Sequence, residues 1–113
     1  MKLKVLVLYC DKLNECLKFY SSFGYLFNEA KDGFAPSNFV GISADDEMMI
    51  FIYRAIVPNS RMMLIFESSD LGGIVANLVS NGFRHMQMKH ENKILAEISL
   101  TDPEGRRIIV NKK

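Results

Sequence analysis

The chain has 113 residues, enough for one domain with a substantial core and too few for two independent enzymatic domains. Lysine and arginine nearly balance aspartate and glutamate, so that the formal net charge is +1, and no basic run is interleaved with aromatic residues as a nucleic-acid groove requires. No apolar run approaches the ~20 residues that span a bilayer. The composition therefore argues against nucleic-acid and membrane partners and favours a cytoplasmic protein.

The first half of the chain is predicted to fold as a strand, a helix and three further strands. The run Leu3–Tyr9 is apolar except for Lys4, as expected of a strand that is covered on both faces and lies centrally in its sheet. Asp11 is expected to cap the following helix, which ends at Gly24. The three strands that follow are predicted over Tyr25–Glu29, Phe39–Ser43 and Met48–Arg54.

The second half is predicted to repeat this order after a connector at 56–60, where Pro58 interrupts strand pairing. Its predicted elements are a strand over Arg61–Glu67, a helix capped by Ser68 or Ser69, and strands over Phe83–Lys89, Ile94–Thr101 and Arg106–Lys112. A constant shift in residue number, hereafter the repeat offset, brings Gly24 onto Gly82. The same shift aligns the first strand and helix of the first half with the first strand and helix of the second half. We therefore predict a single α+β domain, residues 1–113, made of two βαβββ modules over 1–56 and 61–113.

Two segments also resemble a known family. Leu13–Gly24 resembles the first-helix signature of the vicinal oxygen chelate superfamily, which contains glyoxalases, bleomycin-resistance proteins and extradiol dioxygenases. Asp102–Val110 is similar to the final hairpin of that superfamily, in which Asp-Pro-Glu-Gly forms the turn into the last strand. The resemblance covers the whole chain. It implies a curved mixed sheet of eight strands around a cup, usually completed in a homodimer.

The resemblance also implies where a metal would bind. Metal-dependent members hold a divalent ion with His, Gln or Glu side chains on the first and last strands of each module. The corresponding positions here are Val5 or Lys4, Ile50 or Phe51, Met63, and Ile109. None of these side chains is expected to ligate, because hydrocarbon has no lone pair to offer and lysine is protonated at neutral pH. We therefore predict no metal and no other cofactor.

Other residues with reactive side chains are few. Cys10 and Cys16 match no metal or redox spacing and are predicted to be buried, reduced thiols. His85 on the predicted sixth strand and His90 in the turn after it are interpreted as surface imidazoles. Glu67 has the strand parity of Met63 and is the better candidate for a carboxylate in the cup, whereas Glu97 is expected to face water. One carboxylate without a partner gives little basis for acid–base catalysis, so no catalytic residue is assigned.

The sequence thus predicts a cup lined mainly by hydrocarbon, which suits a small aromatic or amphipathic molecule. The predicted ligand-binding residues are Tyr9, Phe51, Arg54, Met63, Glu67, Arg107 and Ile109. The guanidinium groups of the two arginines are predicted to bind an anionic group of the ligand. The predicted function is a metal-free, dimeric binding protein of the bleomycin-resistance type that sequesters a hydrophobic or drug-like ligand in a cup at the interface of the modules or of the dimer. Two alternatives stay open: a lyase, isomerase or dioxygenase of the same superfamily with a shifted metal site, and a structural or interaction dimer whose own side chains fill the cup.

Overall fold

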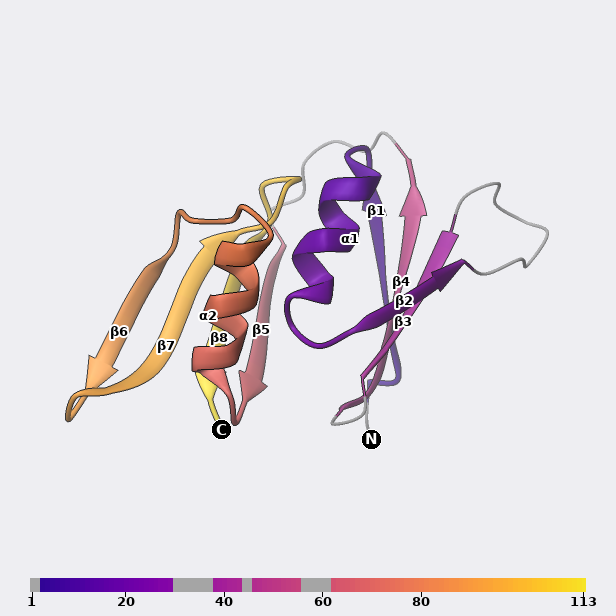
Figure 1. The fold of residues 1–113 in the computed structure, drawn as a ribbon. Helices are drawn as coiled ribbons and strands as arrows, with labels where there is room; N and C mark the ends of the chain where they lie inside the picture. Colours follow the sequence, from indigo (N-terminus) through magenta and orange to yellow (C-terminus); the bar gives the residue numbers. More distant parts are fainter. Residues whose placement is uncertain (1–2, 30–37, 44–45, 56–61) are drawn as a thin grey trace. The chain divides into compact units, whose positions relative to one another are not determined.

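The computed structural model of the chain describes residues 3–29, 38–43, 46–55 and 62–113. Its contacts divide the chain into two units, Met1–Pro58 and Asn59–Lys113, hereafter unit 1 and unit 2. Each unit contains a strand, a helix and three further strands, so that the two predicted βαβββ modules are confirmed (Figure 1). The predicted connector at 56–60 lies outside the described residues. In the part of the chain that is described, no helix is long and apolar enough to cross a membrane.

Unit 1 consists of β1 (Val5–Cys10), α1 (Leu13–Ser21), β2 (Leu26–Glu29), β3 (Asn38–Ser43) and β4 (Asp46–Arg54). Its sheet has the order β1-β4-β3-β2, in which β1 is parallel to β4 and the other pairs are antiparallel. The prediction that the first strand is central in its sheet is therefore wrong for this four-stranded sheet, because β1 lies at its edge. Val5, Val7 and Tyr9 are 36%, 38% and 49% exposed.

Helix α1 covers one face of the sheet of unit 1. It buries Cys16, Phe19 and Tyr20, and the buried residues of the strands are Leu8, Cys10, Ile50 and Ile52. The ring of Phe19 meets the rings of Tyr20 and Phe23 edge to face, with centroid distances of 5.0 and 5.3 Å. Both cysteines are buried and reduced, as predicted. The core of the unit thus lies between the helix and the alternate strand residues that face it.

A glycine in β3 is explained by its cross-strand neighbour. Gly41 pairs with Phe27 on one side and with Ile50 on the other. A Cβ atom at position 41 would lie 2.5 Å from Cε1 of the Phe27 ring. The ring therefore occupies the space of the missing side chain, which is a common reason for glycine inside a strand.

Unit 2 consists of β5 (Met63–Ser68), α2 (Leu71–Ser80), β6 (Gln87–Glu91), β7 (Ile94–Thr101) and β8 (Arg107–Lys112). Its sheet has the order β5-β8-β7-β6, with β5 parallel to β8. Helix α2 buries Leu71, Ile74 and Leu78, and the strands bury Ile98, Leu100, Ile108 and Val110. The repeat offset carries the bounds of β1 onto those of β5 and the start of α1 onto that of α2. Gly24 and Gly82, which follow the two helices, have φ values of +97° and +92°, as expected of left-handed stop residues.

Both predicted helix caps are wrong by one or two residues. Helix α1 has Lys12 at its N-cap without a side-chain cap bond. Helix α2 has Asp70 at its N-cap, and the Asp70 Oδ1 atom accepts a hydrogen bond of 3.0 Å from the amide of Gly73. Ser68 does not cap the helix but binds the residue that does: its hydroxyl oxygen accepts a hydrogen bond of 3.0 Å from the amide of Asp70.

Strand β6 begins at Gln87, four residues later than predicted, and extends to Glu91. Asn92 and Lys93 have φ values of 51° and 66°, and Glu91 pairs with Ile94. A two-residue turn of the type that suits a twisted hairpin therefore joins β6 to β7. As a result His90 lies in the strand instead of the turn, and His85 lies before the strand instead of within it.

Candidate functional site

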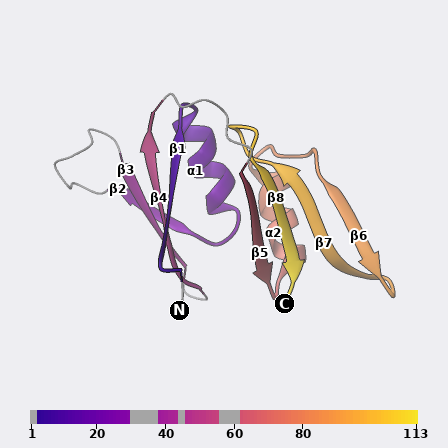
Figure 2. The same ribbon diagram turned by 180° about the vertical axis from the view of Figure 1, so that it is seen from behind.

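Each sheet has one face that the helix of its own unit does not cover (Figure 2). Strands β1 and β4 place six side chains on the uncovered face of unit 1, and these six are hereafter called open face 1: Val5, Val7, Tyr9, Met49, Phe51 and Tyr53. The uncovered face of unit 2, hereafter open face 2, presents Met63, Ile65, Glu67, Gln87, Lys89, Glu97, Ser99, Thr101, Arg107, Ile109 and Asn111. Six of the seven predicted ligand-binding residues lie on these two faces.

Open face 1 is apolar and ends in a group of aromatic rings. Tyr9 and Tyr53 are register partners on β1 and β4, and their ring centroids are 5.9 Å apart. Phe51 follows on the same face of β4, with its ring centroid 6.5 Å from that of Tyr53. Such a surface can accept a flat apolar group by burial and by offset ring contacts.

Arg54, the seventh predicted residue, does not lie on open face 1. Its register partner is Cys10, which is buried on the side of α1. Arg54 is exposed, and it lines a hollow of about 250 Å³ at the start of α1 together with Asp11, Lys12 and Glu15, among others. The hollow is lined by two cations, Arg54 and Lys12, and by two carboxylates, Asp11 and Glu15, so its formal charges balance and give an anion no net attraction.

Open face 2 changes in character along its strands. One cross-strand row contains Met63, Arg107 and Thr101; the next contains Ile65, Ile109, Ser99 and Gln87; the third contains Glu67, Asn111, Glu97 and Lys89. The first row holds one basic group and no acidic one, the second is uncharged, and the third holds two carboxylates and one lysine. The distinction drawn from the sequence between Glu67 and Glu97 is therefore wrong. The register of β7 against β8 places both carboxylates on the same face, on either side of Asn111.

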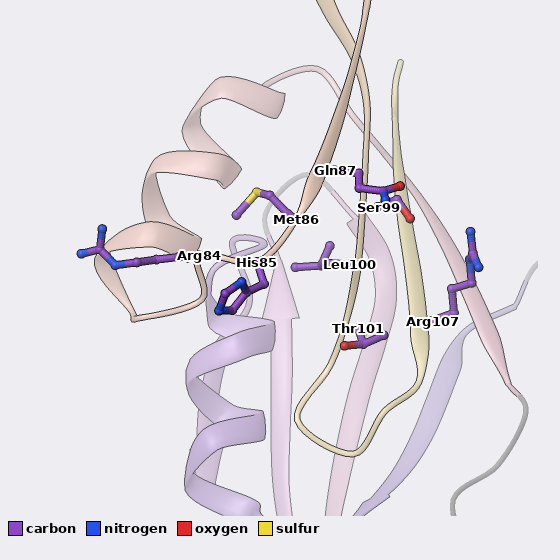
Figure 3. A pocket seen from close by; sticks show the side chains of 8 residues that line it. All are labelled: Arg84, His85, Met86, Gln87, Ser99, Leu100, Thr101 and Arg107. Atoms are coloured by element: carbon purple, nitrogen blue, oxygen red, sulfur yellow. The ribbon is translucent and has the colours of Figure 1, made fainter.

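A hollow of about 740 Å³ lies at the Arg107 end of the sheet of unit 2. Its lining residues are Arg84, His85, Met86, Gln87, Ser99, Leu100, Thr101 and Arg107. Figure 3 shows the side chains of Gln87, Ser99 and Arg107 to one side of β7, and those of His85, Met86 and Leu100 to the other. The Arg84 side chain points away from Arg107 in the same view.

Of these lining residues, only Arg107 is among the predicted ligand-binding residues. The sequence predicted Gln87 in the interior of a strand over Phe83–Lys89, whereas it is the first residue of β6 in the structure. A signal for Ser99 was present in the sequence, because the polar residues Glu97, Ser99 and Thr101 alternate with apolar ones along β7.

The side chains at the implied metal positions do not fit a divalent ion. Ile50 is fully buried on the side of α1, so that Phe51 is the residue that open face 1 offers at the second position. Val5, Met63 and Ile109 occupy the other positions and face the same open sides. Within the described ranges, no three His, Cys, Asp or Glu side chains are grouped so that they could hold a metal ion.

No family model and no curated protein matches the sequence. Solved structures match over nearly the whole chain. The antibiotic-binding protein TnmS3 from a Streptomyces species is similar with a TM-score of 0.70 at 13% identity, over 99% of this chain and 95% of that chain. A bleomycin-binding protein complexed with bleomycin gives a TM-score of 0.66 at 14% identity, over 100% of this chain and 98% of that chain. A lactoylglutathione lyase from Agrobacterium tumefaciens gives a TM-score of 0.61 at 13% identity, over 98% of this chain and 92% of that chain.

The chain has the glyoxalase/bleomycin-resistance fold. This is the fold of the vicinal oxygen chelate superfamily, and it confirms the fold class predicted from the two sequence motifs. At these identities the likeness is one of fold alone. Because binding proteins and a lyase share the glyoxalase/bleomycin-resistance fold, the function has to be argued from the residues on the open faces.

Proposed function

We propose that this protein binds a small aromatic or amphipathic molecule on the open faces of its glyoxalase/bleomycin-resistance fold, without a metal ion and without altering the ligand. The main support is the content of open face 1. Hydrocarbon and aromatic side chains, Val5 and Phe51, stand where metal-dependent members of the superfamily hold their ligands. Hydrocarbon can bury an apolar ring, but it does not polarise a bound carbonyl or activate a water molecule.

Binding is compatible with this fold, because binding proteins occur among the similar structures. Two of the similar structures are an antibiotic-binding protein and a bleomycin-binding protein. The third is a lyase, so an enzyme of the same fold is the alternative to be separated from a binding protein. Bleomycin itself is a cationic ligand, and the carboxylates Glu67 and Glu97 on open face 2 are the groups that would attract a cation.

We also propose that the protein acts as a homodimer, as the family resemblance implies. Val7 and Tyr9 are 38% and 49% exposed on β1, which lies at an edge of its four-stranded sheet. An apolar group of this kind on an edge strand is usually covered in the assembled protein, because it otherwise invites aggregation.

The proposal is tested by calorimetric titration of the EDTA-dialysed protein with bleomycin and with 1-anilinonaphthalene-8-sulfonate. Saturable binding of at least one compound is expected, with a negative heat-capacity change from apolar burial. Adding Zn²⁺ should leave the affinity unchanged, and mass spectrometry should recover the compound intact. Binding that requires Zn²⁺, or conversion of the compound, would contradict the proposal.

Two sets of variants test whether the ligand binds on the open faces and whether the protein converts it. Phe51→Ala should weaken binding by about three- to tenfold, the loss expected for one aromatic contact. Met88→Ala is the control, because Met88 is an exposed apolar residue whose register partner Ile98 faces α2, so it lies on the opposite face to a ligand on the open side. Substituting His85 and His90 should leave binding of a neutral ligand unchanged, whereas an enzyme that used either imidazole would lose its turnover.

A further inference from the structure

We propose that the Arg107 end of open face 2 is an oxyanion subsite, which takes a carboxylate or phosphate group of the ligand. The subsite consists of Arg107, Thr101, Ser99 and Gln87. This inference rests on the proposed binding function and narrows the ligand to an amphipathic anion. No sequence motif indicated this group of residues, and it becomes apparent only from the strand register of unit 2.

The register brings the four residues of the subsite together. Arg107 pairs directly with Thr101, and Ser99 pairs directly with Gln87. Ser99 and Thr101 are alternate residues of β7, about 7 Å apart along the strand, and neighbouring strands are about 4.8 Å apart. All four residues line the hollow of about 740 Å³. In Figure 3 the Arg107 side chain extends along the sheet to the level of Ser99 and Gln87.

The chemistry of these side chains suits an oxyanion. The guanidinium of Arg107 is exposed and permanently charged, and no described residue forms an ion pair with it. Its planar set of donors matches the oxygen atoms of a carboxylate or a phosphate. The hydroxyl groups of Ser99 and Thr101 and the amide of Gln87 are neutral donors in the lining of the same hollow.

The rest of open face 2 fixes how such a ligand would be oriented. Glu67 and Glu97 each lie four residues along their strands from the Arg107 row, which corresponds to about 13 Å. Lys89 pairs with Glu97 and offsets one of these carboxylates, so this row keeps a net negative charge, whereas the Arg107 row has a cation and no carboxylate. The oxyanion therefore binds at the Arg107 end. Ile65 and Ile109 lie between the two ends and offer apolar surface to the body of the ligand. The arrangement therefore favours a molecule with one anionic end and an apolar body.

Three naphthalene compounds of similar size test the subsite by calorimetric titration at neutral pH and low salt: 1-naphthoate, 1-naphthyl phosphate and the neutral 1-naphthamide. At least one of the two anions should bind about tenfold more tightly than the amide, because a charge-assisted hydrogen bond is gained. Tighter binding of the phosphate would indicate a tetrahedral oxyanion, and tighter binding of 1-naphthoate a planar one.

Arg107→Gln should remove the advantage of the anions and leave the affinity for 1-naphthamide unchanged. Arg84→Gln is the matched control, because it removes an equal charge from the lining of the same hollow while its side chain points away from Arg107 (Figure 3). Arg107→Lys should keep part of the advantage, because the charge stays but the planar donor pair is lost. Circular dichroism confirms that each variant is folded.

Two results would overturn the subsite while leaving the proposed function intact: equal affinity for 1-naphthoate, 1-naphthyl phosphate and 1-naphthamide, or an equal loss in Arg84→Gln and Arg107→Gln. Failure of all three compounds to bind would also overturn it. The proposed function would then still be decided by the titrations with bleomycin and 1-anilinonaphthalene-8-sulfonate.

Discussion

Asp102 organises the turn between β7 and β8. Its Oδ1 atom accepts hydrogen bonds of 2.9 Å from the amides of Glu104 and Arg106. Its Oδ2 atom accepts a hydrogen bond of 2.8 Å from Nη1 of Arg106, and both side chains are buried. Gly105 completes the turn with a φ value of +88°. The Asp-Pro-Glu-Gly-Arg segment that resembles the family hairpin is thus explained by the geometry of the turn.

Asp102→Asn is expected to lower the free energy of unfolding by about 3 kcal/mol, because it leaves the buried Arg106 guanidinium without its counter-charge. Urea denaturation measures the effect. Arg107→Gln is the control, since the neighbouring exposed arginine should change stability by no more than about 0.5 kcal/mol. Equal losses in the two variants would show that the ion pair does not hold the turn.

Gly72 and Gly73 are adjacent in α2 but have different surroundings. A Cβ atom at Gly72 would meet nothing, so Gly72→Ala should raise the free energy of unfolding by about 1 kcal/mol through helix propensity. A Cβ atom at Gly73 would meet the carboxylate of Asp70, which caps the helix through the Gly73 amide. Gly73→Ala should therefore gain nothing in net stability, because it displaces the cap. Thermal unfolding of Gly72→Ala and Gly73→Ala measures the two effects. Equal stabilisation by the two variants would contradict the expected displacement of the cap.

Helices α1 and α2 begin at corresponding residues of the two modules but differ in how their first amides are satisfied. Asp70→Ala is expected to lower the free energy of unfolding by about 1 kcal/mol, because the bond to the Gly73 amide is lost. Lys12→Ala removes the corresponding residue, which makes no side-chain cap bond, and should change it by less than about 0.5 kcal/mol. Chemical denaturation compares the two. A larger loss of stability in Lys12→Ala than in Asp70→Ala would contradict the stabilising role assigned to the cap bond of Asp70.

The elements of this chain were predictable where their signals are local. Apolar periodicity, the repeat offset and the glycines after the helices are all read from short segments, and they gave the number, type and order of the described elements. The position of β1 at an edge was not predictable, because Leu3–Tyr9 has the same apolar pattern in an edge strand with an open face as in a central strand. The end of β6 at Glu91 was missed because the two-residue turn that follows it contains Asn92 and Lys93 and no glycine.

At the scale of the whole molecule, the two modules keep the same scaffold and present different open faces. On the side of each helix, apolar pairs correspond under the repeat offset, as Ile50 does to Ile108. On the open sides, the pair Tyr9 and Tyr53 corresponds to Glu67 and Asn111. For six of the seven predicted site residues the open face followed from strand parity, whereas Arg54 lies on the other side of its strand. The grouping of Arg107 with Ser99 and Gln87 did not follow from parity, because it depends on the register between strands that are distant in sequence.

The apolar side chains of open face 1 also allow a test of assembly. If the homodimer covers this face, Val7→Asp should shift the sedimentation coefficient from dimer to monomer, because burying an unpaired carboxylate costs several kcal/mol. Val7→Thr is the matched control: it keeps the size and branching of the side chain and should remain dimeric. A wild-type protein that sediments as a monomer at all concentrations would contradict the dimer and would mean that a single chain suffices for the fold. A Val7→Asp variant that stays dimeric would place the dimer contact elsewhere than open face 1.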